Sequence, residues 1–387
     1  MTPGARASAA MGVLDQVLAG APVERVLTNW ARGARYAGSS DRAALRDIVF
    51  QCLRCRSSYA ALGGGLTGRG LVLGYIRSLP EARQAEFFTG GPHDPLPPDP
   101  VSEAGGPPVG AEAFNIPDWL ETPLRRSLGD EFGAVMAAMS DRAPVFLRVN
   151  PLKASPSEAV QSLAAEGISV AACPGLPLAL EVVSGERRLG GSAAYAAGLV
   201  ELQDLSSQAV VASLPLRDGI KVLDQCAGGG GKTLAMAAMA GVRLYAHDAN
   251  PRRMADLPER ARRAGVAVTI LDEPEREAPF DLVLVDAPCS GSGSWRRDPA
   301  GKWALTEARL AELLQIQQQI LRRAAAMVGP GGWLGYATCS LLAAENDDQV
   351  AAFLAAFPGW SLTRRLVLTP LSGGDGFFLA VLQPPSA

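Results

Sequence analysis

The sequence predicts an α/β protein whose C-terminal half folds into a parallel, doubly wound sheet. Three observations support this class. From about residue 221 short apolar runs alternate with segments of helical periodicity, a glycine-rich turn follows the first run, and acidic residues end successive runs. Strands that alternate with helices are typical of βαβ units and a parallel sheet. With 387 residues, 48% of them apolar, the chain is long enough for two or three domains.

Residues 1–89 are predicted to form a helical, arginine-rich domain. Up to position 83 there are eleven arginines, no lysine and five acidic residues, which gives 11 − 5 = +6 within a chain of net charge −3. We weigh two interpretations of this charge, a phosphate-facing module and an ordinary solvated surface, and charge alone does not separate them.

The six cysteines do not predict a disulfide framework in a chain of this size. Cys52 and Cys55 form a C-x-x-C pair, but they belong to a helical stripe with Leu45 and Val49, and the two histidines of the chain are not in ligand spacing. We therefore expect buried thiols and no metal site. Cys173 is also expected to be structural.

A linker and a small αβ subdomain are predicted next. Residues 90–112 are rich in Pro and Gly, including the run GPHDPLPPDP, and show no periodicity. Residues 113–200 contain a helical repeat from Trp119, a strand at 146–150, and a helix that Ser155 and Glu158 open as a capping box.

The last predicted domain, residues 201–387, supplies the parallel sheet. The expected strands and helices follow in order: a strand at 220–224, a helix at 234–240, a strand at 243–247, a proline-initiated helix at 251–264, the strands VTIL and DLVLVD, a long amphipathic helix at 310–328, a turn at Gly331-Gly332, and the strands WLGYAT and GFFLAVL.

The first motif that carries chemistry is DQCAGGGGKT, from Asp224 to Thr233. A P-loop would need Gly where Cys226 stands, although Gly231-Lys232-Thr233 matches its end. A nucleoside-cofactor site instead needs an acid at the end of the second strand to bind ribose hydroxyls, and Asp248 stands there. Asp272 ends the third strand, where an adenine contact is expected. These successive acids favour the nucleoside interpretation.

Two further motifs place cysteines at the same edge of the predicted sheet. VDAPCSGSGSWRRDP puts Asp286 at the end of the fourth strand, followed by Cys289, and YATCS puts Cys339 at the end of the fifth. Ligands of open α/β sheets bind at this edge. One cysteine there is usually a small buried hydrophobic residue, but two of them beside Asp286 point to catalysis.

These segments resemble the RNA cytosine-5 methyltransferases of the Sun/RsmB (NOL/NOP/Sun) family. DQCAGGGGKT, DAPCSGSG and TCS match its motifs, as do LRVNPLK, VELQDLSSQ and GDGFF, so that the likeness covers about residues 113–383. Gly228 and Gly229 depart from the alanine and proline usual there. The resemblance implies a Rossmann-like doubly wound methyltransferase sheet, preceded by a small αβ (RRM-like) segment and an all-helical NusB-like RNA-binding domain.

The resemblance also implies roles for single residues. Cys339 would add to carbon 6 of the cytosine, Asp286 would stabilise the proton gained at nitrogen 3, Cys289 would assist loss of the carbon 5 proton, and Lys232 would favour the thiolate. The following residues would hold S-adenosylmethionine: Cys226, Ala227, Gly228, Gly229, Gly230, Gly231, Lys232, Asp248, Asp272 and Asp286. Arg296 and Arg297, which come shortly after DAPCSGSG, are expected to contact RNA phosphate.

We therefore expect a cytoplasmic, monomeric enzyme that methylates carbon 5 of a cytosine in RNA, with 16S ribosomal RNA as the favoured substrate and no membrane association. The alternatives are a transfer RNA methyltransferase, a non-catalytic RNA-binding or ribosome-assembly factor with the same fold, a P-loop hydrolase, and an exocyclic-amine methyltransferase. The last needs no thiol and usually carries Asn/Asp-Pro-Pro-aromatic where this chain has DAPC.

Overall fold

The computed structural model describes residues 1–385 and divides the chain into two compact units. The first consists of residues 1–142 and 295–305, and the second of residues 143–294 together with the chain from 306 onward. The first unit includes residues 113–142 and 295–305, which the predicted borders assign to the small αβ subdomain and to the sheet domain. Among the described residues, no helix has the length and apolar character that crossing a membrane requires.

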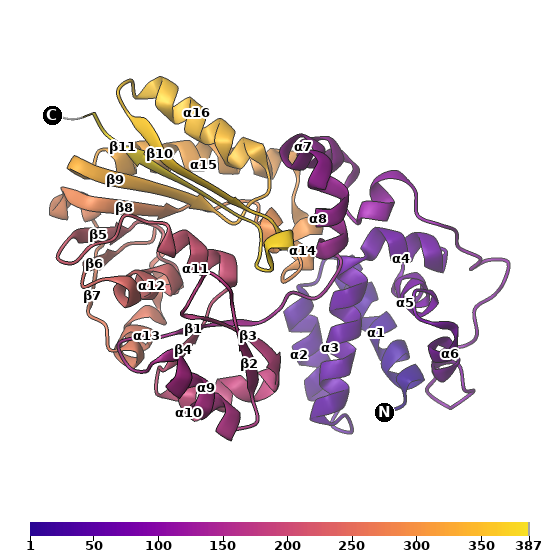
Figure 1. Cartoon of the computed structure of the whole chain (residues 1–387). Helices are drawn as coiled ribbons and strands as arrows, with labels where there is room; N and C mark the ends of the chain where they lie inside the picture. The colour runs from indigo at the N-terminus through magenta and orange to yellow at the C-terminus, as the bar shows by residue number, and fades with distance from the viewer. Residues whose placement is uncertain (386–387) are drawn as a thin grey trace. The chain divides into compact units, whose positions relative to one another are not determined.

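The first unit is helical, as predicted for the N-terminal region (Figure 1). Its helices are α1 (Pro3–Leu18), α2 (Val23–Gly33), α3 (Ser39–Arg54), α4 (Arg56–Gly63), α5 (Gly68–Arg77), α6 (Glu81–Gln84), α7 (Asp118–Leu128), α8 (Phe132–Met139) and α14 (Pro299–Ala304). Residues 90–109 contain no helix or strand, as expected of the linker, and a short 3-10 helix follows at Gly110–Phe114. The likeness of this unit to NusB stays a prediction.

The core of the first unit forms where apolar stripes of α1, α3 and α5 meet. Leu14, Leu45, Val49 and Leu71 are fully buried there. Cys52 and Cys55 are buried in the same core, as the helical stripe predicted.

The small sheet of the second unit has the order β2-β3-β1-β4, and all its neighbours are antiparallel. Its elements are β1 (Phe146–Val149), α9 (Pro156–Ala165), β2 (Ser169–Ala172), β3 (Ala179–Ser184), α10 (Ala193–Ala196) and β4 (Val200–Leu202). The predicted capping box is present, because the Ser155 amide donates to the Glu158 carboxylate at 2.8 Å and the Glu158 amide donates to the Ser155 hydroxyl at 3.3 Å. Cys173 is buried beside this sheet.

The large sheet of the second unit has the order β10-β11-β9-β8-β5-β6-β7. Its strands are β5 (Lys221–Asp224), β6 (Arg243–Ala246), β7 (Val268–Ile270), β8 (Phe280–Asp286), β9 (Val328–Thr338), β10 (Ser361–Leu368) and β11 (Phe377–Gln383). The first five are parallel, as predicted, whereas β11 is antiparallel to both β9 and β10. The sequence did not predict β10, because Thr363, Arg364 and Arg365 interrupt the apolar residues of this exposed edge strand, which reads SLTRRLVL.

Helices cover both faces of the large sheet (Figure 1). Helices α15 (Glu307–Ala325) and α16 (Asp347–Ala356) pack against the face that carries Val283 and Tyr336. Helices α11 (Leu205–Ala212) and α12 (Gly231–Met239) pack against the opposite face, with Leu282 and Leu284. Alternate residues of β8 thus enter different cores, as the two-residue period of a strand requires.

Two predicted elements differ in detail. The helix expected at 251–264 is a 3-10 turn (Pro251–Met254) followed by α13 (Leu257–Ala264), because Pro258 has no N–H with which to continue the helical ladder. The turn expected at Gly331-Gly332 is a bulge inside β9: pairing with β8 jumps from Phe280–Val328 to Leu282–Trp333, and Gly331 has φ +70°.

Candidate active site

The candidate site lies at the carboxyl edge of the large sheet, where the strand order reverses. β5 pairs with β6 on one side and with β8 on the other, so that the loops after β5 and β8 diverge. Such a switch point is the usual ligand site of an open α/β sheet. The loops after β5, β6, β8 and β9 carry the residues that the sequence motifs singled out.

The glycine-rich loop joins β5 to α12 in a conformation that needs glycine. Gly228 and Gly230 have φ values of +50° and +81°, in the left-handed region that side chains disfavour. A Cβ on Gly230 would lie 2.2 Å from Leu257 Cδ1. The departure from the family pattern at Gly228 is therefore compatible with the local backbone. Cys226 lies in this loop, where burial raises the pKa of its thiol.

Asp248 follows β6 and is buried against this loop. Its carboxylate accepts hydrogen bonds from the amides of Gly228 at 3.0 Å and Asn250 at 2.9 Å, and it lies 3.2 Å from Arg253 Nη1. The structure thus brings Asp248 to the glycine-rich loop. Asp272 is exposed, two residues after the end of β7.

Asp224 ends β5 and is almost completely buried. Its Oδ2 accepts from Thr233 Oγ1 at 2.6 Å, while its Oδ1 has no hydrogen-bond partner among the described residues. Burial raises the pKa of Asp224 to about 7.

Cys289 and Cys339 lie side by side, with their Sγ atoms 3.4 Å apart. The register of β8 and β9 produces this contact, because Asp286 lies opposite Ala337 and both cysteines come shortly afterwards. The hydrogen bond from Cys289 holds the pKa of Cys339 below its usual value, and the Lys232 charge acts in the same direction. The same hydrogen bond, together with burial, raises the pKa of Cys289 well above its usual value. Cys339 is therefore the thiol that ionises first.

Lys232 is buried and forms an ion pair with Asp286, with 2.6 Å between Nζ and Oδ2. Its Nζ also lies 4.8 Å from the centre of the Phe377 ring. Burial acts to lower the pKa of Lys232, but the Asp286 charge and hydrogen bond outweigh it and leave the pKa above its usual value. Lys232 is thus a fixed positive charge in the site and not a solvated helix-terminal lysine.

Glu345 is a residue of this site that the sequence reasoning missed. It is fully buried, and its carboxylate accepts from the Ser290 amide at 2.8 Å, from the Ser290 and Ser340 hydroxyls at 2.5 Å each, and from Gln317 Nε2 at 3.0 Å. Ser290 and Ser340 each follow one of the paired cysteines. One carboxylate therefore ties both cysteine loops together. The available signal was an acid in the otherwise apolar run LLAAEN after Cys339.

The motifs VELQDLSSQ and GDGFF support the Cys289 loop from one side. Asp204 caps α11 through the Ser206 amide at 2.8 Å and accepts from the Asp375 amide at 3.0 Å. The Gly376 amide then donates to the Gly293 carbonyl at 2.9 Å. Side chains would not fit at this crossing, because a Cβ on Gly293 would lie 2.1 Å from the Gly376 oxygen.

Two arginines, one on β1 and one on α13, bind carbonyl groups of the glycine-rich loop. Arg148, in the LRVNPLK motif, donates to the Gly231 carbonyl at 3.0 Å. Arg260 donates to the Gly229 carbonyl and pairs with the buried Glu201, which also binds Arg263. Arg260 and Arg263 thus bind groups of the protein, whereas Arg252 and Arg262 of the same segment are exposed.

Arg296 and Arg297 belong to the first unit, together with Trp303. Arg296 is buried and its carbonyl accepts from Arg54 Nε at 2.7 Å, whereas Arg297 is exposed. The Trp303 indole donates to the Leu53 carbonyl of α3 at 2.7 Å. Of the two arginines, Arg297 is the one accessible to a phosphate.

Sequence comparison matches most of the chain from residue 116 onward to one family. The family described as 16S rRNA methyltransferase RsmB/F matches residues 211–383, and the ferredoxin-like domain of RsmF/B-like methyltransferases matches residues 116–186. Ribosomal RNA small subunit methyltransferase B of Citrobacter koseri is 33% identical over 336 residues, 81% of this chain and 73% of that protein. Its counterpart in Klebsiella pneumoniae is 34% identical over 284 residues, 69% of this chain and 65% of that protein. The chain thus spans about two thirds of the length of these relatives.

Solved structures share the fold. The crystal structure of PH0851 superposes with a TM-score of 0.77 at 23% identity and covers 99% of both chains. NSun6 from Pyrococcus horikoshii, solved with SFG, gives a TM-score of 0.63 at 18% identity and covers 70% of this chain and 99% of that one. These likenesses confirm the methyltransferase sheet that the sequence predicted.

Proposed function

Because the chain belongs to the RsmB/F family of 16S rRNA methyltransferases, we propose that it methylates carbon 5 of a cytosine in 16S ribosomal RNA through a covalent adduct on Cys339. The observation that supports this chemistry is the contact of Cys289 with Cys339 at 3.4 Å, in a site that also holds the Lys232–Asp286 pair. An exocyclic-amine methyltransferase or a non-catalytic factor has no use for two adjacent thiols of unequal acidity.

The residues around the glycine-rich loop fit S-adenosylmethionine, which would supply an electrophilic methyl group. Asp248 offers a buried carboxylate for ribose hydroxyls, and the unpartnered Oδ1 of Asp224 is an acceptor on the same loop. The turn from Cys226 to Gly231 precedes the first N–H groups of α12, and Lys232 and Asp286 complete the expected set. Asp272, which is exposed after β7, would contact the adenine of the cofactor.

Cys339 would act as the nucleophile. Carbon 5 of cytosine is a poor nucleophile, and addition of the Cys339 thiolate to carbon 6 turns the base into an enamine whose carbon 5 is electron-rich. The Sγ–carbon 6 bond forms, and the electron pair displaced from the carbon 5–carbon 6 bond is shared with nitrogen 3. The hydrogen bond from Cys289 and the Lys232 charge both favour the thiolate form that this step consumes.

Asp286 would bind the pyrimidine edge and hold the proton gained at nitrogen 3. Its carboxylate is oriented by Lys232, and the pair is shielded by Phe377 on one side. A preorganised charge pair of this kind stabilises developing charge without reorganising at the moment of reaction.

Cys289 would complete the cycle. Once carbon 5 carries its methyl group, its proton must leave and the Sγ–carbon 6 bond of Cys339 must break. Cys289 is the thiol nearest to Cys339. It would release its own proton to solvent after the adduct has formed, take up the carbon 5 proton as a thiolate, and thereby become again the hydrogen-bond donor to the departing Cys339 thiolate. A cytosine inside a helix does not reach such a site, so the substrate base is unpaired or flipped.

Bisulfite sequencing of total RNA from cells with and without the gene tests the substrate. We expect one 16S cytosine to lose its protection when the gene is absent. Loss at a transfer RNA cytosine would contradict the 16S substrate, and loss at neither would contradict cytosine-5 methylation altogether.

A further inference from the structure

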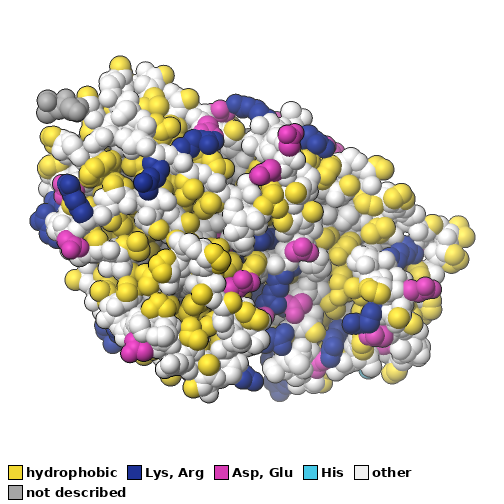
Figure 2. Space-filling view, in the orientation of Figure 1, with side chains coloured by type: hydrophobic (Ala, Val, Ile, Leu, Met, Phe, Trp, Pro, Cys, Tyr) yellow, Lys and Arg dark blue, Asp and Glu magenta, His cyan; other side chains and the backbone are white. Residues whose placement is uncertain are grey.

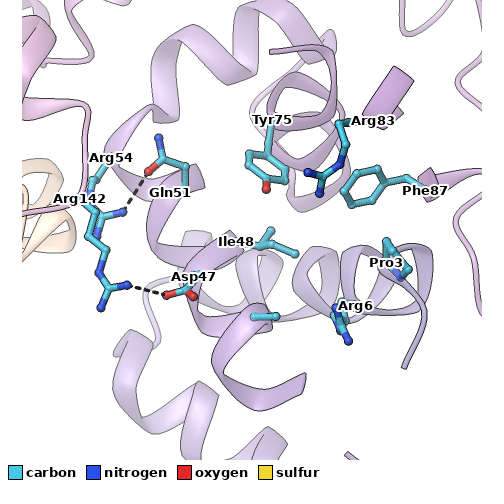
Figure 3. Close-up of a pocket in the computed structure, with 11 residues that line it drawn as sticks. Pro3, Arg6, Asp47, Ile48, Gln51, Arg54, Tyr75, Arg83, Phe87 and Arg142 are labelled. Atoms are coloured by element: carbon cyan, nitrogen blue, oxygen red, sulfur yellow. Dashed lines mark hydrogen bonds and ion pairs between the residues drawn. The ribbon is translucent and has the colours of Figure 1, made fainter. Parts of the chain in front are cut away.

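The first unit contains a cavity of about 370 Å³ whose wall is rich in arginine (Figure 3). α1, α3, α5 and α6 contribute to the wall, together with Phe87 and Arg142. Four arginines line it against a single carboxylate, that of Asp47; they are Arg6, Arg54, Arg83 and Arg142. Elsewhere, positive and negative side chains are interspersed over the face shown in Figure 2.

Arg54 is the arginine of this wall that forms no ion pair with a carboxylate of the described residues. Its Nε donates to the Arg296 carbonyl at 2.7 Å and its Nη1 to Gln51 Oε1 at 3.1 Å, and no ion pair joins it to an acid within residues 1–385. Only 8% of the residue is exposed. Buried charges in proteins are normally paired, so an uncompensated guanidinium on a cavity wall favours an anionic ligand.

A second buried cation lies next to Arg54. Lys302 is 4% exposed, donates to the Arg54 carbonyl at 2.9 Å, and likewise pairs with no carboxylate in the described part of the chain. Burial lowers the pKa of Lys302 to about 7. Arg56 lies over the Trp303 ring at 4.6 Å beside it. With a pKa of about 7 Lys302 is only partly charged at neutral pH, so the positive charge of this corner of the unit comes mainly from Arg54 and Arg56, and a bound anion would favour the charged form of Lys302.

Arg83 and Arg142 form ion pairs whose partners are largely exposed. Arg83 pairs with Glu86, three residues on, at 2.9 Å, and Arg142 lies 4.0 Å from Asp47. Exposed pairs of this kind contribute about 0–1 kcal/mol, so an anion in the cavity can replace them as partner. Arg6 differs, because it is bound closely to Asp41 at 2.8 Å.

Aromatic side chains form the opposite part of the wall. Tyr75 and Phe87 meet edge to face with 6.4 Å between ring centres, and Figure 3 shows them beside Arg83 and across from Arg54. A charged rim combined with an aromatic surface is the pattern that binds single-stranded nucleic acid, by phosphate contact and by base stacking.

We propose that this cavity binds one nucleotide of the RNA substrate, with its phosphodiester on Arg54, Arg83 and Arg142 and its base against Tyr75 and Phe87. The proposal rests on the proposed function, since it takes RNA as the substrate. It assigns part of the +6 charge of the N-terminal segment to a defined site instead of a solvated surface.

The test compares two double variants that remove the same charge. Arg83→Ala/Arg142→Ala empties the cavity rim without touching the buried Arg54, and Arg25→Ala/Arg35→Ala removes two exposed arginines of the same unit that do not line the cavity. Fluorescence anisotropy measures the Kd for a single-stranded 16S-derived oligonucleotide at several salt concentrations. We expect the rim variant to weaken binding about 10- to 50-fold and to lower the salt slope by about one, as the loss of one phosphate contact requires. The control is expected to change Kd by less than about 3-fold.

Equal loss in both double variants, or loss in neither, would overturn the proposal. AMP is the second probe: binding of AMP alone as tight as that of the oligonucleotide would assign the cavity to a free nucleotide and also overturn it. Because the readout is RNA affinity, failure here is distinct from failure of methyl transfer. At saturating RNA the rim variant is expected to keep the kcat of the unmodified protein and to raise KM.

Discussion

Cys289 Sγ lies 3.4 Å from Cys339 Sγ, although the two residues follow different strands and are fifty positions apart in the sequence. The contact makes the thiols unequal: Cys289 donates and its pKa rises, whereas Cys339 accepts and its pKa falls. These opposite pKa shifts suit the roles that we propose, Cys339 as the nucleophile and Cys289 as the proton carrier, and the Lys232 charge favours the Cys339 thiolate as well.

The first prediction concerns the acidity of Cys339. In Cys289→Ala the thiolate loses its hydrogen-bond donor, so the pKa of Cys339 rises. The rate of iodoacetamide alkylation at Cys339, followed by mass spectrometry from pH 6 to 10, should show its midpoint shifted upward relative to the unmodified protein. An unchanged or lower midpoint would show that the hydrogen bond does not set the acidity of Cys339.

The second prediction concerns Lys232. Lys232→Met keeps the length of the side chain but removes the charge that favours the thiolate and orients Asp286. We expect kcat to fall about 10- to 1000-fold and the pH midpoint of kcat to move upward. Lys221→Met is the matched control, because Lys221 lies at the opposite end of β5 and pairs with Glu277; it should leave kcat within about 2-fold. Equal effects of the two variants would contradict the assignment.

The third prediction concerns Glu345 as a positioning residue. Glu345→Ala removes the shared acceptor of four buried donors, at about 1–3 kcal/mol for each donor that finds no other partner, and should unfold at lower urea concentration. Glu345→Gln keeps the shape and should fold. We expect its kcat to fall about 10-fold, because the loops of both cysteines shift, while its Kd for RNA stays constant.

A purely structural role for Glu345 would give a different result. Glu345→Gln would then lose stability in urea but keep both kcat and the alkylation rate of Cys339. Glu312→Gln, on the exposed side of α15, controls for the substitution itself.

The fourth prediction concerns Asp224 and stability. Its pKa rises from 3.8 in the unfolded chain to about 7 when folded, so the folded state holds a proton that the unfolded state has lost. The free energy of unfolding therefore falls as pH rises through this window. Asp224→Asn cannot ionise and can still accept from Thr233. The free energy of unfolding of Asp224→Asn minus that of the unmodified protein should therefore be roughly 1–3 kcal/mol larger at pH 8 than at pH 5, as measured by urea unfolding.

Asp256→Asn is the control, because Asp256 is exposed and its side chain makes no capping hydrogen bond. The difference in free energy of unfolding between this variant and the unmodified protein should not change from pH 5 to pH 8. A constant difference between Asp224→Asn and the unmodified protein at the two pH values would contradict the raised pKa.

The sheet and its catalytic edge were predictable because the signals are local. A buried parallel strand is a short apolar run, and its carboxyl end is marked by the residue that follows it, so Asp248, Asp286, Cys289 and Cys339 could be assigned to one edge. Their direct contact follows from the register of β8 against β9. The exposed strand β10 escaped prediction because an edge strand needs only one apolar face.

The residues that support the site were not predictable because their partners are distant in sequence. Glu345 reaches Ser290 across 55 positions, and Arg260 reaches Glu201 across 59. In the sequence Glu345 is an isolated acid and Arg260 one arginine of a charged helix, and neither carries a periodic or motif signal of its partner. The cavity at Arg54 is of the same kind, since four elements of the chain build it.

The covalent step is the central claim, and a denaturing gel tests it most directly. Cys289→Ala, incubated with labelled 16S-derived RNA and S-adenosylmethionine, should accumulate a slow-migrating protein–RNA band, because the adduct on Cys339 forms but resolves slowly. The band should disappear in Cys289→Ala/Cys339→Ala. A band that persists in the double variant, or methyl transfer by Cys339→Ala alone, would contradict the assignment of Cys339 as the nucleophile.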